Sequence, residues 1–389
     1  MSNLTPIIAS RMRFIGLAAV LLGATACGGG GGGGGGGASS SPPPAPAPAP
    51  APTPDPTPEP PPTAEIDVAM EQVIDEVVIA GAQRFLSGTD TLVADAAAFC
   101  SGGTNGLAAL QTQWEGLQER WFFLANYVFG PLNDNIVSPV FYFIDSLRLR
   151  GTDYTETVRA VIAEDISSDQ VLDDAYFASK TFQRVGLLAL EATLFETATG
   201  ERSQDIDVIT AEFANTPRKC EVLEGLARQL NTQAQYVVDG WLVQHRNSDE
   251  PYRTLFLNGE TDDGTEPLVQ LILGLQEHLE YLQARRVAEI TSQLSQHTWE
   301  AISAAIDGAE AFLEGNEATT VSIFDVMVAR GEGAAVDEVR GSIAAIREAI
   351  ALEDPAILEV RLGELDGNFK REIADGLGVE LGVNFSDGD

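Results

Sequence analysis

The chain has 389 residues, 44% of them hydrophobic, so it contains enough apolar side chains to fill a core. Its formal net charge of −35 repels phosphate backbones, which excludes nucleic acid as an expected partner. A solvated acidic surface accounts for this charge without any specific ligand.

Residues 1–26 have the features of an export signal. Arg11 and Arg13 precede the apolar run FIGLAAVLLGATA, which is too short to span a bilayer as a helix but suits a signal-peptide core. The run ends at Cys27 in LLGATAC, which resembles the lipobox of bacterial lipoproteins. That resemblance implies lipidation of Cys27 and a stable anchor in the cell envelope, at the outer membrane, facing the periplasm or the cell surface. Ordinary cleavage near Ala26 is the alternative.

Residues 27–63 are expected to form a disordered tether. Residues 28–37 are all glycine, and SSSPPPAPAPAPAPTPDPTPEPPP continues the segment to Pro62. Glycine runs behave as flexible coil, whereas the proline-rich part favours polyproline II and reaches roughly 75 Å at about 3.1 Å per residue. A spacer of this kind would hold the following domain clear of its membrane.

The spacing of apolar residues predicts an all-α fold, a helical bundle, over residues 64–389. Apolar residues recur at intervals of three and four, and alternation with period two is scarce. Glycine and proline fall where helix ends are expected. The polar stretch 247–267 is expected to separate two packed helical halves, residues 64–246 and 265–389.

Two cysteines remain once Cys27 is assigned to the lipid anchor. Cys100 and Cys220 lie in a chain expected to be exported, and an even pair in an oxidising compartment favours a disulfide over a metal site or a nucleophile. A Cys100–Cys220 disulfide would close a loop of about 120 residues and contribute about 4 to 5 kcal/mol in the chain-entropy model.

Standard catalytic motifs are missing from the sequence, which has no GxSxG, no HExxH, no CxxC pair and no glycine-rich phosphate loop opening a helix. His297 lies three residues before Glu300, so both would share one helix face and could offer two metal ligands. In a chain this acidic, an exposed helix pair formed by chance is the simpler interpretation.

Three segments resemble one known family. The ending LGVELGVNFSDGD is similar to the characteristic C-terminus of imelysins, and QTQWEGLQERWFFLANYVFGPLNDN resembles their early Trp-containing helix, which ends in Gly-Pro. The segment VGLLALEATLF then falls where imelysins carry a GxHxxE motif on a helix. The resemblance covers residues 64–389 and implies the helical fold of that family.

Placed on this sequence, the imelysin motif falls on Gly186, Leu188 and Glu191, so the glycine and the glutamate match and the histidine is replaced. The resemblance implies that the family's His and Glu, one helix turn apart, ligate a metal ion such as iron, copper or zinc. Leucine has no lone pair to donate. Glu191 is therefore the one metal-ligand candidate left in the motif, unless a donor from elsewhere takes the place of the histidine.

Glu191 is surrounded in sequence by leucines and a phenylalanine, so we expect its carboxyl group to be at least partly buried. An unpaired buried ion costs several kcal/mol, so the group needs a partner. We expect an ion pair with Arg148, Arg150 or Arg184, or else a protonated and hydrogen-bonded acid. A ligand-site acid and a simply exposed glutamate are the alternatives.

A second cluster of polar residues lies in FYFIDSLRLRGTDYTETV, beside aromatic side chains. Its members are Asp145, Arg148, Arg150, Asp153 and Tyr154. A helix terminus with local ion pairs is the simpler interpretation of this pattern. The alternative is that these residues form a wall of a binding cleft.

These features leave three functions of different classes. The resemblance, the lipid anchor and the spacer favour a binding protein of the bacterial envelope associated with iron or other metal uptake, with the membrane and a metal ion or envelope component as partners. A metallopeptidase is the second, because imelysins are classed with peptidases. The missing histidine argues against an enzyme, since zinc hydrolysis needs about three protein ligands. A non-catalytic scaffold lipoprotein is the third.

Overall fold

The computed structural model describes residues 63–102, 106–135, 137–146, 152–198, 205–284 and 286–381. The predicted signal peptide, Cys27 and the tether lie outside the described residues, as do Arg148, Arg150 and the family-like ending from residue 382 onward. Within these ranges the chain forms helices and no β-strand, so the all-α prediction is confirmed. None of the described helices is long and apolar enough to cross a membrane.

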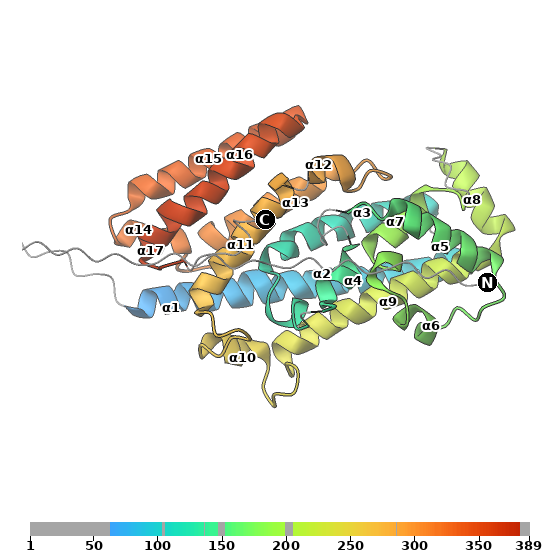
Figure 1. Cartoon of the computed structure of the whole chain (residues 1–389), viewed down its shortest axis with the longest axis horizontal. Helices are drawn as coiled ribbons and strands as arrows, with labels where there is room; N and C mark the ends of the chain where they lie inside the picture. The colour runs from blue at the N-terminus through green and yellow to red at the C-terminus, as the bar shows by residue number, and fades with distance from the viewer. Residues whose placement is uncertain are drawn as a thin grey trace, which may run out of the picture. The chain divides into compact units, whose positions relative to one another are not determined.

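The first group of helices runs from residue 63 to residue 242 (Figure 1). Its α-helices are α1 (Thr63–Gln72), α2 (Ala80–Cys100), α3 (Leu107–Leu124), α4 (Val140–Ile144), α5 (Thr155–Ser167), α6 (Asp174–Ala178), α7 (Leu187–Phe195), α8 (Ile206–Asn215) and α9 (Pro217–Leu242). A π-helical segment, Val73–Ile79, joins α1 to α2, and short 3₁₀ turns cover Ala125–Tyr127, Gly130–Leu132 and Phe182–Arg184.

The second group of helices runs from residue 252 to residue 377. Its α-helices are α10 (Tyr252–Leu257), α11 (Pro267–Ala284), α12 (Val287–Ile290), α13 (Thr298–Glu314), α14 (Ile323–Ala329), α15 (Gly333–Leu352), α16 (Pro355–Asn368) and α17 (Ala374–Leu377), with a π-helical segment at Phe369–Ile373.

Several helix ends follow from local chemistry. Ser322 and Asp325 form a capping box at the start of α14, where each side chain bonds the other residue's backbone N–H. The Asp354 carboxylate accepts from the first free amides of α16, and Pro355 follows at the first helical position. Gly315 ends α13 with a φ of 76°, a left-handed value that glycine adopts without strain.

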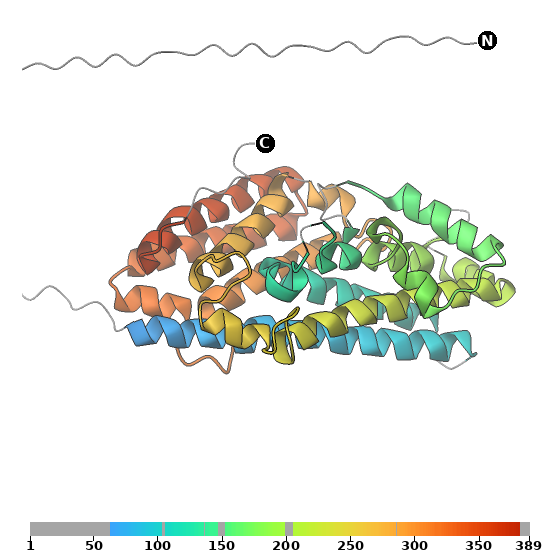
Figure 2. The same cartoon turned by 60° about the horizontal axis from the view of Figure 1, so that its bottom comes forward.

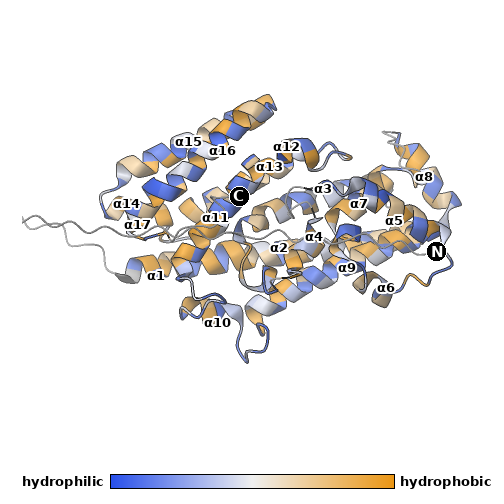
Figure 3. Cartoon of the chain, in the orientation of Figure 1, coloured by the Kyte–Doolittle hydropathy of each residue, from blue (hydrophilic) through white to orange (hydrophobic). Residues whose placement is uncertain are grey.

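Long helices lie side by side and bury their apolar faces against one another (Figure 2). Helix α2 packs against α9 on one side and against α3 on another, and α3 in turn packs against α13. Helix α11 packs against α16, which also packs against α15. Hydrophilic and hydrophobic residues alternate along most helices in Figure 3, as expected for amphipathic helices that share a core.

The predicted boundary near residues 247–267 contains helix α10 rather than only solvated linker. Tyr252 and Phe256 are fully buried, because their rings pack against Trp241 of α9 at centroid distances of 5.0 and 6.3 Å. Phe129 stacks on Phe256 at 5.4 Å and completes the cluster. These aromatic side chains fix the segment to the bundle, and the division into two halves at this point stays a prediction.

The Cys100–Cys220 disulfide is present, as predicted. It joins the last residue of α2 to the first turn of α9 across a sequence separation of 120 residues, with the two Cα atoms 5.6 Å apart. The disulfide therefore links α2 and α9, two helices that pack against each other extensively.

Candidate functional site

Helix α7 and the glycine before it carry the predicted motif positions Gly186, Leu188 and Glu191, and the helix begins in contact with the end of α4. Gly186 has a φ of 83°, and a Cβ at this position would lie 2.6 Å from the carbonyl oxygens of both Phe143 and Ile144. Only glycine fits this conformation and this close approach of two backbones. The motif glycine therefore serves packing, and it places the start of α7 against the segment that leads to Asp145.

Two tryptophans of α3 fix this junction from the other side. The indole N–H of Trp114 donates to the Leu187 carbonyl oxygen at 3.0 Å, and that of Trp121 donates to Oδ2 of Asp145 at 2.9 Å. Asp145 is buried, with 5% of its surface exposed. The structure thus brings Asp145 close to the motif helix through α3, a connection that the sequence did not predict.

The other described members of the predicted polar cluster have different roles. Asp153 is exposed, and its Oδ1 accepts from the backbone N–H and the hydroxyl of Thr155 at 2.8 and 2.5 Å, so it caps the start of α5. Tyr154 is half-buried and meets the ring of Phe182 edge-on at 6.2 Å. The capping by Asp153 fits the expected helix terminus, whereas the cleft wall stays a prediction.

Glu191 lies inside the protein, with 2% of its surface exposed, so its predicted burial is confirmed. Its Oε1 accepts hydrogen bonds from the Leu294 amide at 3.0 Å, from the Ser295 amide at 2.9 Å and from the Ser295 hydroxyl at 2.9 Å. Burial raises the pKa of Glu191 to about 7, although the bonds from Ser295 and Leu294 act in the opposite direction. The nearby charge of Glu196 adds a smaller upward shift of the same pKa.

Among the described residues, the partners of Glu191 lie in the loop between α12 and α13, which gives its carboxyl group hydrogen bonds. Arg184 is exposed and forms no ion pair with Glu191 in the described part of the chain, and Arg148 and Arg150 lie outside that part. Sequence reasoning missed Leu294 and Ser295, because two of the three donors are backbone amides about a hundred residues away.

The loop that holds Glu191 contains two non-glycine residues with left-handed backbone conformations. Ser292 has a φ of 47° and Gln296 a φ of 62°, which cost energy that the surrounding contacts must offset. Such a loop directs successive N–H groups toward one point. The bonds from Leu294 and Ser295 to one carboxyl oxygen therefore provide the contact that this conformation needs.

His297 follows the same loop but turns toward α3. Its Nε2 lies 2.8 Å from Oε1 of Glu119, and its Nδ1 lies 3.7 Å from Oε2 of Glu300. Its side chain is only 15% exposed, so the expected exposed pair with Glu300 is instead a bridge between α3 and α13. Burial raises the pKa of Glu115 in this cluster, His297 lowers it, and the charges of Glu119 and Glu300 raise it.

The donors at the motif do not fit a metal ion. Leu188, the position predicted to replace the motif histidine, is 6% exposed and offers a hydrocarbon, and Oε1 of Glu191 already accepts three hydrogen bonds. Across the residues that the structure describes, no group of three or more His, Cys, Asp or Glu side chains is arranged to hold a metal. The motif residues are thus built as packing and hydrogen-bonding elements.

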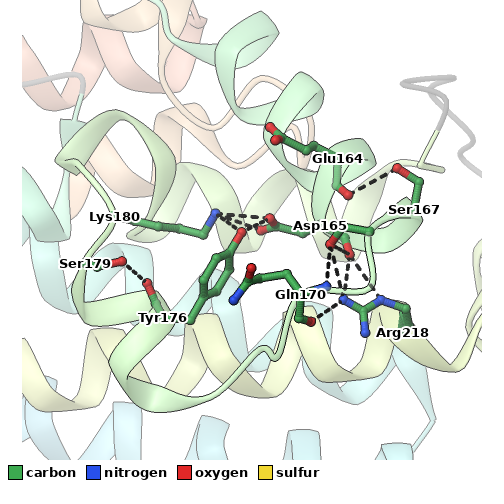
Figure 4. A network of polar contacts seen from close by, with 9 residues as sticks. Glu164, Asp165, Ser167, Gln170, Tyr176, Ser179, Lys180 and Arg218 are labelled. Atoms are coloured by element: carbon green, nitrogen blue, oxygen red, sulfur yellow. Dashed lines mark hydrogen bonds and ion pairs between the residues drawn. The ribbon is translucent and has the colours of Figure 1, made fainter.

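A separate buried ion pair joins α5, α6 and α9 (Figure 4). Lys180 Nζ lies 2.9 Å from Oδ2 of Asp165, and both side chains are at most 6% exposed. Tyr176 donates its hydroxyl to the same carboxylate, and Arg218 of α9 donates to the Asp165 carbonyl oxygen at 3.0 Å. Each charge in this network has a partner, so the cluster fastens three helices and offers no open coordination position.

Comparison with known proteins identifies the family. The imelysin family profile matches residues 78–371. An imelysin-like protein from Psychrobacter arcticum 273-4 superposes with a TM-score of 0.60 at 15% identity, covering 82% of this chain and 97% of the other. A protein named an iron-regulated protein A precursor, from Parabacteroides distasonis ATCC 8503, superposes with a TM-score of 0.54 at 15% identity. The match covers 81% of this chain and 96% of the other. No curated protein matches the chain. With the profile spanning most of its length, the chain belongs to the imelysin family.

Proposed function

We propose that this imelysin is a non-enzymatic binding protein of the bacterial envelope that serves the acquisition of iron or another metal, tethered to its membrane by a lipid on Cys27. The observation that carries the proposal is that Glu191 is bonded to the α12–α13 loop, and it is joined by the prediction that Leu188 takes the place of the family's histidine. Family membership and the iron-regulated name of one structural neighbour support the link to metal acquisition.

Peptidase chemistry fits these residues poorly. A catalytic zinc needs about three protein ligands and an open position for water, and the motif supplies one carboxyl group whose Oε1 is already bonded. The raised pKa of Glu191, about 7, also leaves much of this acid protonated at neutral pH, which weakens it further as a ligand. We therefore assign the motif a structural role in this chain, with ligand binding elsewhere.

The tether supports a location at the membrane. Cys27 follows an apolar run preceded by arginines, and the glycine and proline segment after it supplies a long spacer. The Cys100–Cys220 disulfide agrees with folding in an oxidising compartment. A domain on such a tether could meet ligands or envelope components away from the membrane surface.

Growth under metal limitation tests the proposal. In the native host, we expect deletion of the gene to slow growth when iron, copper or zinc is chelated, and we expect the wild-type gene and Glu191→Gln to restore growth. Cys27→Ser should lose metabolic labelling with palmitate and restore growth poorly. Equal growth of the deletion strain under all three limitations would reject the role in metal acquisition.

The same strains separate this function from a metallopeptidase. Glu191→Gln keeps an acceptor for the loop but removes the acid, so a peptidase that uses Glu191 would lose function in this variant. Hydrolysis of denatured casein by the purified full chain, abolished by Glu191→Gln and by chelators, would favour the peptidase and contradict the structural role of the motif.

A further inference from the structure

A pocket of about 170 Å³ lies where α2, α3 and α13 meet. Arg84 of α2 and Arg120 of α3 line it together with Phe123 and Ala304. The guanidinium carbon of Arg84 lies 5.0 Å from the centre of the Phe123 ring. The pocket therefore combines two positively charged guanidinium groups with an aromatic ring and a small apolar side chain.

Neither arginine pairs with a carboxylate in the described ranges, although the chain has 58 acidic residues and only 23 basic ones. Partial burial lowers the pKa of Arg84, Tyr127 raises it, and the positive charge of Arg120 lowers it. Two like charges held in one pocket repel each other unless an anion lies between them. In a protein with this excess of acidic residues, two neighbouring arginines without a carboxylate partner are not expected by chance.

The two acids at the same pocket have cationic or imidazole partners of their own. Glu119 bonds Nε2 of His297 at 2.8 Å, and Asp307 pairs with Arg347 at 2.5 Å. Each of these carboxylates therefore has a partner other than Arg84 or Arg120. The side of the pocket formed by Arg84 and Arg120 keeps its positive charge.

Gly88 sets the position of Arg120. A Cβ at Gly88 would overlap Nη1 of Arg120, so the guanidinium group lies directly on the backbone of α2, one helix turn from Arg84. The two guanidinium groups thus come from two packed helices, α2 and α3, and they line the same pocket. Planar forks of this kind match carboxylate groups in a bidentate manner.

We propose that this pocket binds a small organic acid that carries two or more carboxylates, with Arg84 and Arg120 each taking a carboxylate and Phe123 contacting the carbon skeleton. The volume of 170 Å³ suits a molecule of the size of citrate. The proposal concerns a ligand other than a bare metal ion, and it stands whether or not the protein acts in metal uptake.

Calorimetric titration of the full chain with citrate tests the pocket. We expect saturable binding of one citrate per chain, weakened about tenfold or more in Arg84→Gln and in Arg120→Gln, since each removes charge-assisted hydrogen bonds. Gly88→Ala should also weaken binding, because it displaces the Arg120 guanidinium while keeping both charges. Both arginines are largely exposed and form no ion pair among the described residues, so Arg84→Gln and Arg120→Gln should melt close to the wild-type temperature.

Arg340→Gln is the matched control. Arg340 also lies 5.0 Å from the centre of an aromatic ring, that of Phe324, but it pairs with Glu314 at 2.8 Å and lies outside the pocket. Its substitution removes the same charge and should leave citrate binding unchanged. Absence of citrate binding, an equal loss in Arg340→Gln, or tighter binding of inorganic phosphate than of citrate would each overturn the proposal.

Discussion

Ser295 holds the carboxyl group of Glu191 through both its backbone N–H and its hydroxyl, each 2.9 Å from Oε1. The contact joins α7 to the loop before α13, across 104 residues of sequence. At the position where the sequence predicts a metal-ligand acid, the acid of this chain fastens one part of the bundle to another.

The raised pKa of Glu191 predicts a pH-dependent stability that Glu191→Gln removes. Below pH 4.5, the ordinary pKa of a glutamate, the carboxyl group is neutral in both the folded and the unfolded protein. Between pH 4.5 and about 7 it ionises only in the unfolded protein, so the free energy of unfolding falls as the pH rises. This loss amounts to about 3 kcal/mol. Gln keeps an acceptor oxygen but does not ionise. From pH 4 to pH 8, the free energy of unfolding of Glu191→Gln, measured by urea unfolding, should therefore rise by that amount relative to the wild type.

Other carboxyl groups change the absolute pH profile, so the difference between the two proteins is the quantity to compare. Glu359→Gln, at an exposed position on α16, should follow the wild-type profile. A wild-type protein that gains stability over Glu191→Gln as the pH rises would show that the three hydrogen bonds hold an ionised carboxylate, contrary to this prediction.

Gly186→Ala should destabilise the protein far more than a positive φ alone explains. Gly259 also has a positive φ, of 80°, but a Cβ there meets no atom within 4 Å. We expect Gly259→Ala to cost about 1 to 2 kcal/mol and Gly186→Ala about 3 to 5, because the latter also forces its Cβ into two carbonyl oxygens of α4. Equal losses in thermal melting would mean that α7 does not depend on this close approach.

The fold was largely predictable, because apolar spacing of three and four residues and breakers at segment ends are local signals. The disulfide also followed from cysteine number and compartment. The partner of Glu191 could not be predicted, because every residue except proline carries a backbone N–H and the sequence does not mark which of them will donate. The pair of Asp165 with Lys180 was missed for a related reason: in a chain with so many acids, sequence does not indicate which carboxylate a given cation meets.

Reduction of the Cys100–Cys220 disulfide should lower the stability by about 5 kcal/mol, since the closed loop of 120 residues removes much of the entropy of the unfolded chain. The expected result is a clear drop in the melting temperature when dithiothreitol is added. The double variant Cys100→Ser, Cys220→Ser should melt at the reduced temperature with or without the reagent. A wild-type protein insensitive to reduction would indicate that packing of α2 on α9 alone sets the stability.

Restoring the motif histidine should not restore tight metal binding. Leu188→His would place an imidazole one helix turn before Glu191, but Oε1 of that acid is engaged by Leu294 and Ser295, and two donors fall short of the three that zinc sites use. Competition with a chromophoric zinc chelator should therefore give the same result for the wild-type full chain and for Leu188→His. Stoichiometric zinc binding in Leu188→His that is lost in the double variant Leu188→His, Glu191→Gln would show instead that the loop releases the acid when a nitrogen ligand is present, and that the site lacks only its imidazole.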